Sequence, residues 1–311
     1  MVTRFRLPSF KKTSTQPSAA ISASTYNPTM RNEWVIVGAS VIGKDHRKHG
    51  LPCQDNFYYK VIDIDNGWGV AVVADGAGSA KNSHDGSEFV AQRATINTFG
   101  KLIKDKEWHK GRKLPSDAEW TLLAKAKWQE IRGAIEVFAT RKGVESRSLA
   151  CTGIVVVFSP NALLVTHIGD GRAGYQNRQR EWKPLITPFR GEEANATIFL
   201  TSLHLNKESD YDKFVESRVI REPIRAFTLM SDGCEKHAFE SSKLDNAGMW
   251  HDPNLPYRRF FDPLVETLLQ MQADKTPDDE MLQKWAQFLE SGTEGLENEP
   301  DDKTLILGVL A

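Results

Sequence analysis

Apolar residues recur along the chain in two spacings, one typical of strands and one typical of helices. Residues 34–38 and 67–73 are apolar at nearly every position, which indicates strands buried on both faces. Residues 152–159 and 162–168 are rich in Val and Ile and are separated by Ser-Pro-Asn, which predicts a β-hairpin. Further strands are predicted at 172–176, 197–201, 225–231 and 304–310.

Helical spacing predicts helices between these groups of strands. Apolar residues in 87–103 recur about every third or fourth position, as expected for a helix packed on a sheet. Ser116 and Glu119 form a capping-box pattern, and Lys142-Gly143 supplies a C-terminal end. Two more helices are predicted at about 258–273 and 277–291. This order predicts an α+β fold of two packed antiparallel sheets flanked by helices, in preference to a doubly wound parallel sheet.

Two segments lack a regular pattern. Residues 1–31 are rich in Ser, Thr, Pro and Lys, which predicts a flexible tail, with docking or phosphorylation as the alternative to plain disorder. Residues 32–311 are then expected to form one domain. Within it, residues 178–224 are polar and mixed, and they predict a mobile excursion over one end of the fold.

Composition narrows the class of protein. Of the 311 residues, 40% are apolar and 26% are charged, which is ordinary for a soluble globular protein. The 40 basic and 41 acidic residues leave a net charge of −1 without a long basic run, which argues against a nucleic-acid partner. No apolar run approaches the roughly 20 residues of a membrane span, and no secretory signal is visible. Three cysteines without CxxC spacing fit the cytoplasm, and the absence of heptads favours a monomer.

Short aspartate-bearing segments lie where predicted strands begin or end. Asp75 and Asp232 each follow a strand and precede Gly, and Asp301 comes just before the last strand. Asp170 stands in a turn between two strands, and Asp55 follows Gln54. Magnesium and manganese prefer such oxygen ligands, and a carboxylate near the core is costly unless a cation balances it. Taken singly, each segment also fits an ordinary capped turn, a solvated acidic turn or a local salt bridge.

The segments QDN, VVADGAGS, THIGDGRAG, FTLMSDG and DDKTLIL occur in this order across residues 34–310. Together they resemble the metal-dependent type-2C serine/threonine protein phosphatases, and PCQD and GEEANATIFLT point to the bacterial branch of that family. The resemblance implies a four-layer αββα sandwich with the active site at one edge of the central sheets. It also implies Mn²⁺ or Mg²⁺ as cofactor, with two ions and a third, weaker position.

The resemblance also implies a role for each aspartate. Asp75 would bridge two ions, with the carbonyl of Gly76 on one of them, while Asp232 and Asp301 would ligate the second. Asp170 would belong to the third position, which it would share with Asp232. Asp55 would act near the first ion through water, and Asp302 ranks below Asp301 as a ligand. A hydroxide shared by the ions would attack phosphorus without a covalent enzyme intermediate.

Two departures from the family pattern bear on the site. Gln54 stands where the family has an acidic residue, and it adds no negative charge beside the metal. Gly50 stands where the family often has a phosphate-binding arginine. His46 is our first choice for that role and Arg47 the second, because a guanidinium suits phosphate.

The implied function is hydrolysis of phosphoserine and phosphothreonine in a protein substrate, with a Ser/Thr kinase as a partner by analogy. Two alternatives stay open on the sequence. One is a catalytically weak phosphoprotein-binding module, which Gln54 and the missing arginine favour. The other is a two-metal hydrolase of a small phosphate ester, since the metal centre would be the same. Residues 178–224 are where we expect substrate choice to reside.

Overall fold

The computed structural model describes residues 33–189, 197–244 and 248–311. The predicted flexible tail at 1–31 lies outside the described residues. Within the described ranges, no helix combines the length and the apolar character that crossing a membrane would require.

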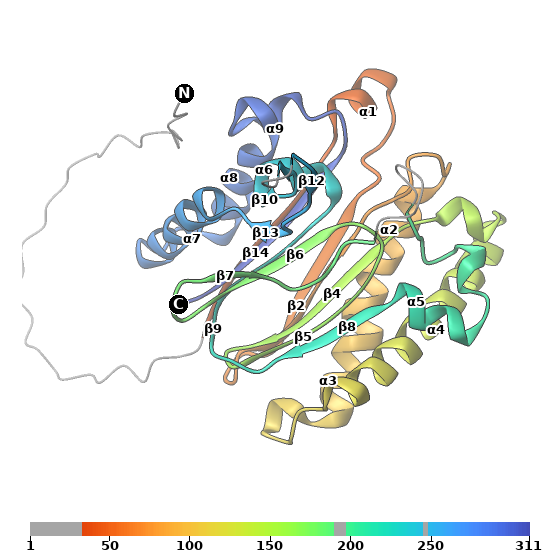
Figure 1. Ribbon diagram of the computed structural model, residues 1–311, viewed down its shortest axis with the longest axis horizontal. Coiled ribbons are helices and arrows are strands. Elements are labelled where there is room, and N and C mark those ends of the chain that lie inside the picture. The colour runs from red at the N-terminus through yellow and green to blue at the C-terminus, as the bar shows by residue number, and fades with distance from the viewer. Residues whose placement is uncertain (1–32, 190–196, 245–247) are drawn as a thin grey trace, which may run out of the picture.

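Two five-stranded antiparallel sheets form the centre of the molecule (Figure 1). The first has the order β1 (Trp34–Val41), β14 (Lys303–Leu310), β9 (Ile224–Met230), β6 (Arg172–Asn177) and β7 (Trp182–Pro184). The second has the order β2 (Asn56–Asp63), β3 (Trp68–Ala74), β4 (Gly153–Ser159), β5 (Ala162–Ile168) and β8 (Glu216–Ile220). The predicted α+β class with antiparallel sheets is confirmed.

Helices cover the outer face of each sheet. On the second sheet, α2 (Ser83–Arg93) runs through a π-helical turn (Ala94–Phe99) into α3 (Gly100–Lys106), beside α4 (Asp117–Lys142). On the first sheet lie α7 (Arg258–Ala273) and α8 (Asp278–Ser291). The shorter elements are α1 (Lys44–His49), α5 (Glu208–Phe214), α6 (Glu235–Ala238), α9 (Glu294–Asn298), β10 (Phe239–Glu240), β11 (Lys243–Leu244), β12 (Trp250–His251) and β13 (Leu255–Pro256). The layers are therefore αββα, as predicted.

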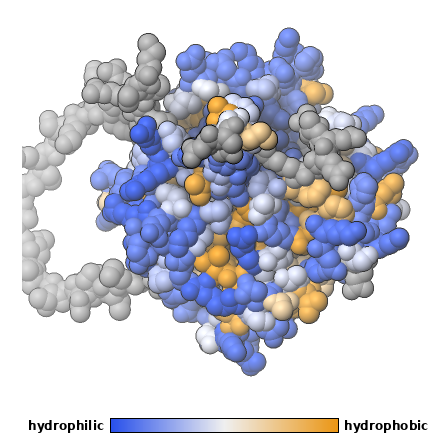
Figure 2. All heavy atoms as spheres, viewed as in Figure 1, coloured by the Kyte–Doolittle hydropathy of each residue, from blue (hydrophilic) through white to orange (hydrophobic). Residues whose placement is uncertain are grey.

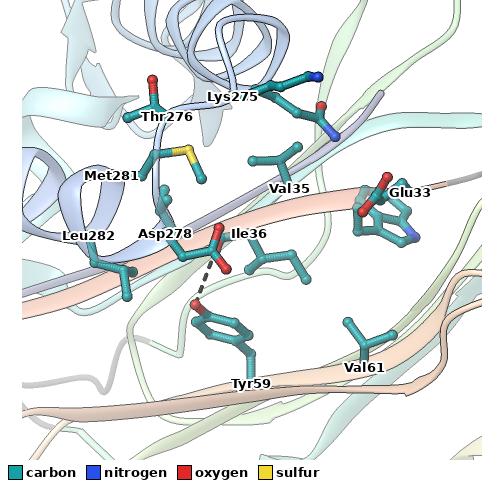
Figure 3. A pocket seen from close by; sticks show the side chains of 13 residues that line it. Glu33, Val35, Ile36, Tyr59, Val61, Lys275, Thr276, Asp278, Met281 and Leu282 are labelled. Atoms are coloured by element: carbon teal, nitrogen blue, oxygen red, sulfur yellow. Dashed lines mark hydrogen bonds between the residues drawn. The ribbon is translucent and has the colours of Figure 1, made fainter.

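Most of the face seen in Figure 2 is hydrophilic, and apolar side chains gather on it only in scattered patches. A groove of about 490 Å³ lies between β1, β2 and the connection from α7 to α8 (Figure 3). Tyr59, Asp278 and Met281 are among its lining residues, and the Tyr59 hydroxyl donates to the carbonyl of Ile36 over 3.1 Å. None of the candidate metal aspartates lines this groove.

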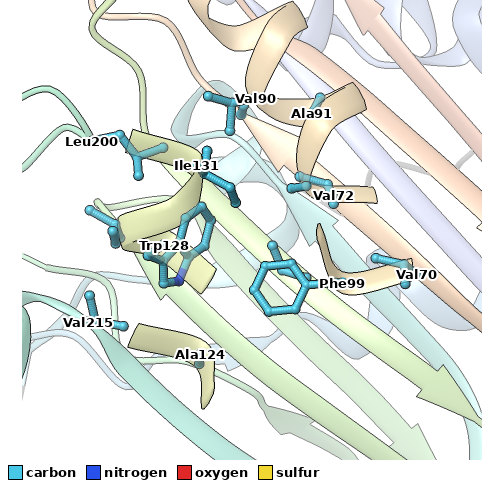
Figure 4. Packing of buried hydrophobic residues seen from close by; sticks show 14 of the residues in the cluster. Val70, Val72, Val90, Ala91, Phe99, Ala124, Trp128, Ile131, Leu200 and Val215 are labelled. Carbon is cyan, nitrogen blue, oxygen red and sulfur yellow. The ribbon is translucent and has the colours of Figure 1, made fainter. Parts of the chain in front are cut away.

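Aromatic side chains fill the layers. Between the sheets, the rings of Phe158 and Phe227 stack with centroids 4.8 Å apart, and Trp34 packs edge-on against both. Under α4, Trp120 and Trp128 are fully buried, and Figure 4 shows Trp128 among the apolar side chains of that layer. Both indoles donate hydrogen bonds into β5, which satisfies their only polar group and fixes the helix on the sheet.

The structure differs from the predictions made from the sequence in the following places. The strand predicted at 197–201 is wrong, because Ser202 N donates to Phe199 O in a turn over 2.9 Å. Ile198 and Leu200 are apolar because they pack into the core beneath α4. The helix predicted at 87–103 contains the π-helical turn, in which Thr95 Oγ1 donates back to Ala91 O over 2.8 Å.

Two edge strands and a short helix are among the elements that the sequence did not predict. β2 lies at a sheet edge and is only partly buried, so its sequence lacks a continuous apolar run. β8 is the opposite edge of the same sheet and lies inside the predicted excursion. The short helix α1 has no buried residue, so it carries no apolar periodicity. The two long C-terminal helices agree with prediction to within one residue at each end.

The capping box of α4 allows a test of the fold. Ser116 Oγ accepts from Glu119 N over 3.3 Å, and Glu119 Oε2 accepts from Ser116 N over 2.7 Å. Ser116→Ala should lower the free energy of unfolding in urea by about 1 kcal/mol, because the helix-end N–H of Glu119 loses its acceptor. Ser291→Ala, at the last residue of α8, is the control and should change it by less than about 0.5 kcal/mol. Equal urea midpoints for the two variants would contradict the assignment.

Candidate active site

The aspartates predicted from the sequence lie at strand ends on one edge of the sandwich. In the first sheet, Val41 pairs with Lys303, and Met230 lies opposite both Leu305 and Arg172. In the second sheet, Asn56 pairs with Ala74, and Gly153 pairs with Ile168. A hydrogen bond of 2.6 Å from Gln54 N to Asp302 Oδ2 joins the start of β2 to the start of β14. The same edge of both sheets therefore carries the candidate residues.

Mutual electrostatic effects show that the carboxylates converge. Burial, followed by the negative charges of Asp55, Asp232, Asp170 and Asp301, raises the pKa of Asp75 well above its ordinary value. Burial and the charges of Asp170 and Asp301 raise the pKa of Asp232 to about 7. Burial is also the main cause that raises the pKa of Asp55 to about 8. The structure thus brings together the five aspartates that the sequence singled out.

Two hydrogen bonds to Thr152 hold the backbone of Asp75 in place. Its N–H donates to Thr152 Oγ1 over 3.1 Å, and its carbonyl accepts from Thr152 N over 2.7 Å. A Cβ on Gly76 would lie 2.5 Å from the carbonyl oxygen of Gln54 and 2.9 Å from Ser83 Cβ. Because nothing larger than glycine fits there, the turn after β3 packs directly on the Gln54-Asp55 segment.

Asp302 has a structural position that differs from that of its neighbour Asp301. Its Oδ1 accepts from Gly43 N over 2.7 Å and its Oδ2 accepts from Gln54 N, while the side chain is 1% exposed. His46 Nδ1 lies 2.9 Å from the same Oδ2. Asp301 is exposed at the rim, its Oδ1 accepts from Asp302 N over 2.8 Å, and partial desolvation of its carboxyl group together with the charge of Asp302 raises its pKa. Both aspartates belong to the edge, and Asp302 holds its loops together.

The two basic candidates on α1 face different ways. The side chain of His46 is 16% exposed and turns inward to Asp302, although Nδ1 makes no hydrogen bond of standard geometry there. The side chain of Arg47 is 57% exposed and forms an ion pair of 3.0 Å with Glu290 of α8. Only His46 is therefore brought toward the aspartates.

The donor set suits a hard divalent cation. Asp55 Oδ2 and Gln54 Oε1 are buried oxygen atoms without a hydrogen-bond partner. The carboxyl groups of Asp75 and Asp232 lie within reach of each other, and a cation between them would balance their charges. In the described part of the chain, no three His, Cys, Asp or Glu side chains are already arranged as a metal-binding cluster. The fit rests on the chemistry of these oxygens and on their burial.

Sequence reasoning missed two polar residues that hold the site. Ser231 hydrogen-bonds the Asp55 carboxyl group, and its Oγ accepts from Thr304 N over 2.9 Å. Thr152, described above, holds Asp75 through its backbone, since Thr152 Oγ1 accepts from Asp75 N. Each is a hydroxyl residue at the end of a buried strand. Ser231 directly precedes Asp232, and this position next to a candidate ligand is the sequence signal that could have identified it.

Comparisons with known proteins agree with this geometry. The family model described as Protein phosphatase 2C matches residues 42–290. Serine/threonine-protein phosphatase 3 of Escherichia coli strain K12 is 30% identical over 283 residues, which are 89% of this chain and 99% of that protein.

Two solved structures have a similar fold. One is PppA, a key regulatory component of T6SS in Pseudomonas aeruginosa, with 14% identity and a TM-score of 0.51 over 90% of this chain and 98% of that one. The other is the catalytic domain of the serine/threonine protein phosphatase PstP in complex with two manganese ions, with 16% identity and a TM-score of 0.50 over 89% and 98%. The fold, the family match and the sequence relative agree, and the chain belongs to the protein phosphatase 2C family.

Proposed function

We propose that this serine/threonine protein phosphatase hydrolyses phosphoserine and phosphothreonine with Mn²⁺ or Mg²⁺ held at the aspartate edge. The observation that carries the proposal is the set of buried carboxylates that raise one another's pKa at one edge of the two sheets. Such a set is unstable at neutral pH unless cations or protons balance it. The family match supports metal dependence.

Each aspartate has a proposed part in holding the ions. Asp75 and the carbonyl of Gly76 would serve the first and second positions, and Asp232 with Asp301 would complete the second. Asp170 would serve a third, weaker position with Asp232. When bound, the ions supply a nucleophilic water near neutral pH and offset the charge on the phosphoryl oxygens.

The chain's own residues would then orient water and substrate. Asp55 is held by Ser231 and has one buried oxygen without a partner, so it would accept a hydrogen bond from a water at the first position. Gln54 Oε1 can accept another without adding charge. His46 would bind a phosphoryl oxygen when its ring is protonated, because it is the basic residue of α1 that faces the edge.

The substrate is proposed to be a phosphorylated protein, and a Ser/Thr kinase that adds the phosphate is the corresponding partner. The three cysteines are all free thiols, which supports the proposed cytoplasmic location. A binding module without turnover is disfavoured, because it would have no use for aspartates that repel one another.

The bridging role of Asp75 is tested by Asp75→Asn. Loss of one negative charge at the centre of the cluster should reduce both Mn²⁺ binding and turnover by at least about 100-fold, more than the loss of an outer partner. Turnover is measured with p-nitrophenyl phosphate and a phosphothreonine peptide while Mn²⁺ is titrated after chelation. Asp105→Asn, on the exposed face of α3, is the control and should behave as wild type. Near-normal activity of Asp75→Asn would remove the bridging role.

The raised pKa values predict how metal and pH act together on stability. Asp55 and Asp232 have folded-state pKa values of about 8 and about 7, above their ordinary value of 3.8. Without metal, their contribution to stability is therefore fully present below about pH 4 and is lost as the pH rises toward 8. Mn²⁺ binds the deprotonated groups, so it should raise the melting temperature more at about pH 8 than at about pH 5.5. Calorimetric scans with Mn²⁺ and with chelator would test this, and equal shifts at both pH values would contradict it.

Substitutions of His46 and Arg47 test which of the two residues binds the phosphate. His46→Ala should raise KM for the phosphothreonine peptide about tenfold, the size expected for one charged hydrogen bond, and leave Mn²⁺ affinity unchanged. Arg47→Ala is the matched control on the same helix and should leave KM near the wild-type value. An unchanged KM in His46→Ala together with a raised KM in Arg47→Ala would assign the role to Arg47.

A further inference from the structure

Arg172 is a buried cation that lies two residues after Asp170. Its side chain is 0% exposed, and it begins β6 directly opposite Met230, near the end of β9 that leads to Asp232. A guanidinium in such a place is stable only when other groups balance its charge and use its N–H donors.

The partners of Arg172 come from three different segments. Nη2 lies 2.9 Å from Glu235 Oε1 and 2.7 Å from Asp252 Oδ2. Nη1 donates to Asn254 Oδ1 over 2.5 Å and to Asp252 Oδ1 over 3.3 Å. The guanidinium also lies over the ring of Phe239, with its central carbon 5.6 Å from the centroid. One side chain therefore joins β6, α6 and the segment before β13, and Figure 1 shows α6, β10, β12 and β13 in one group.

The contact with Glu235 connects two of the proposed metal loops. Glu235 begins α6 and follows Asp232 by a single short turn, so its position fixes the loop that carries Asp232. The backbone of the other loop is equally constrained, since a Cβ on Gly171 would lie 2.7 Å from Met230 O. The separation between Asp170 and Asp232 is thus set by backbone contact on one side and by the Arg172 ion pair on the other.

We propose that Arg172 is a positioning residue for the metal centre, which holds Asp170 and Asp232 at the spacing that a shared divalent ion requires. The role rests on the proposed function, and it acts through Glu235 without contact to substrate. Asp252 and Asn254 extend the same clamp to the segment that follows β12, so this part of the chain is tied to the catalytic edge.

Two substitutions test the clamp by different routes. Arg172→Lys keeps the charge and loses the planar set of donors, while Glu235→Gln removes the negative charge from one arm of the clamp and leaves Arg172 in place. Each should weaken Mn²⁺ binding, measured by calorimetry on the full chain, by about tenfold, the range seen for residues that support metal ligands. The ratio kcat/KM for the phosphothreonine peptide should fall with the affinity at limiting Mn²⁺ and recover when Mn²⁺ is saturating.

Arg225→Lys is the matched control. Arg225 lies near the opposite end of β9 from Asp232 and pairs with Glu266 over 2.8 Å. The Arg225→Lys variant should bind Mn²⁺ with wild-type affinity, whatever the effect of the substitution on the melting temperature.

The outcomes separate the positioning role from the proposed function. Mn²⁺ affinity within about twofold of wild type in both Arg172→Lys and Glu235→Gln would overturn the positioning role alone, since supporting residues act by more than that. If Arg172→Lys does not fold, the Glu235→Gln measurement decides. A wild-type protein that binds no Mn²⁺ would overturn the metal centre and the clamp together.

Discussion

Repulsion among buried carboxylates is the constraint on which the rest of the structure depends. At one edge of the sandwich, burial and the charges of neighbouring aspartates from distant parts of the chain raise the pKa values of Asp55, Asp75 and Asp232. Burial of charges that are not balanced costs several kcal/mol per group, so the sheets and helices must supply the stability that holds this edge together. The aromatic layers between and outside the sheets provide that stability far from the edge itself.

The edge is built with very little free space, and this explains why small and hydroxyl residues surround the carboxylates. At Gly76 and Gly171, backbone atoms of neighbouring segments lie within contact distance of any added Cβ. Thr152 and Ser231 then hydrogen-bond the strand ends that carry Asp75 and Asp55. Because both sheets contribute, the relative position of the carboxylates depends on sheet packing and on local turns at once.

The sequence predicted the parts of this structure that depend on periodicity and on order. Central strands such as β3 and β4 are buried on both faces, so their apolar runs identify them, and α7 and α8 have clear helical patterns. The edge strands β2 and β8 were not predicted, because half-buried strands accept polar residues and therefore lack a continuous apolar run. The strand expected at 197–201 failed for the converse reason, since apolar residues in a turn can also fill a core.

Neighbouring residues of like chemistry show where sequence reasoning stops. Asp301 and Asp302 are indistinguishable by type, yet one is exposed at the rim and the other is buried with both oxygens bonded to loop N–H groups. His46 and Arg47 differ in the same way, because successive residues of α1 point to different sides. The chemistry that a residue can perform is readable from its type, whereas the direction of its side chain is decided by contacts with residues more than 200 positions away in the chain.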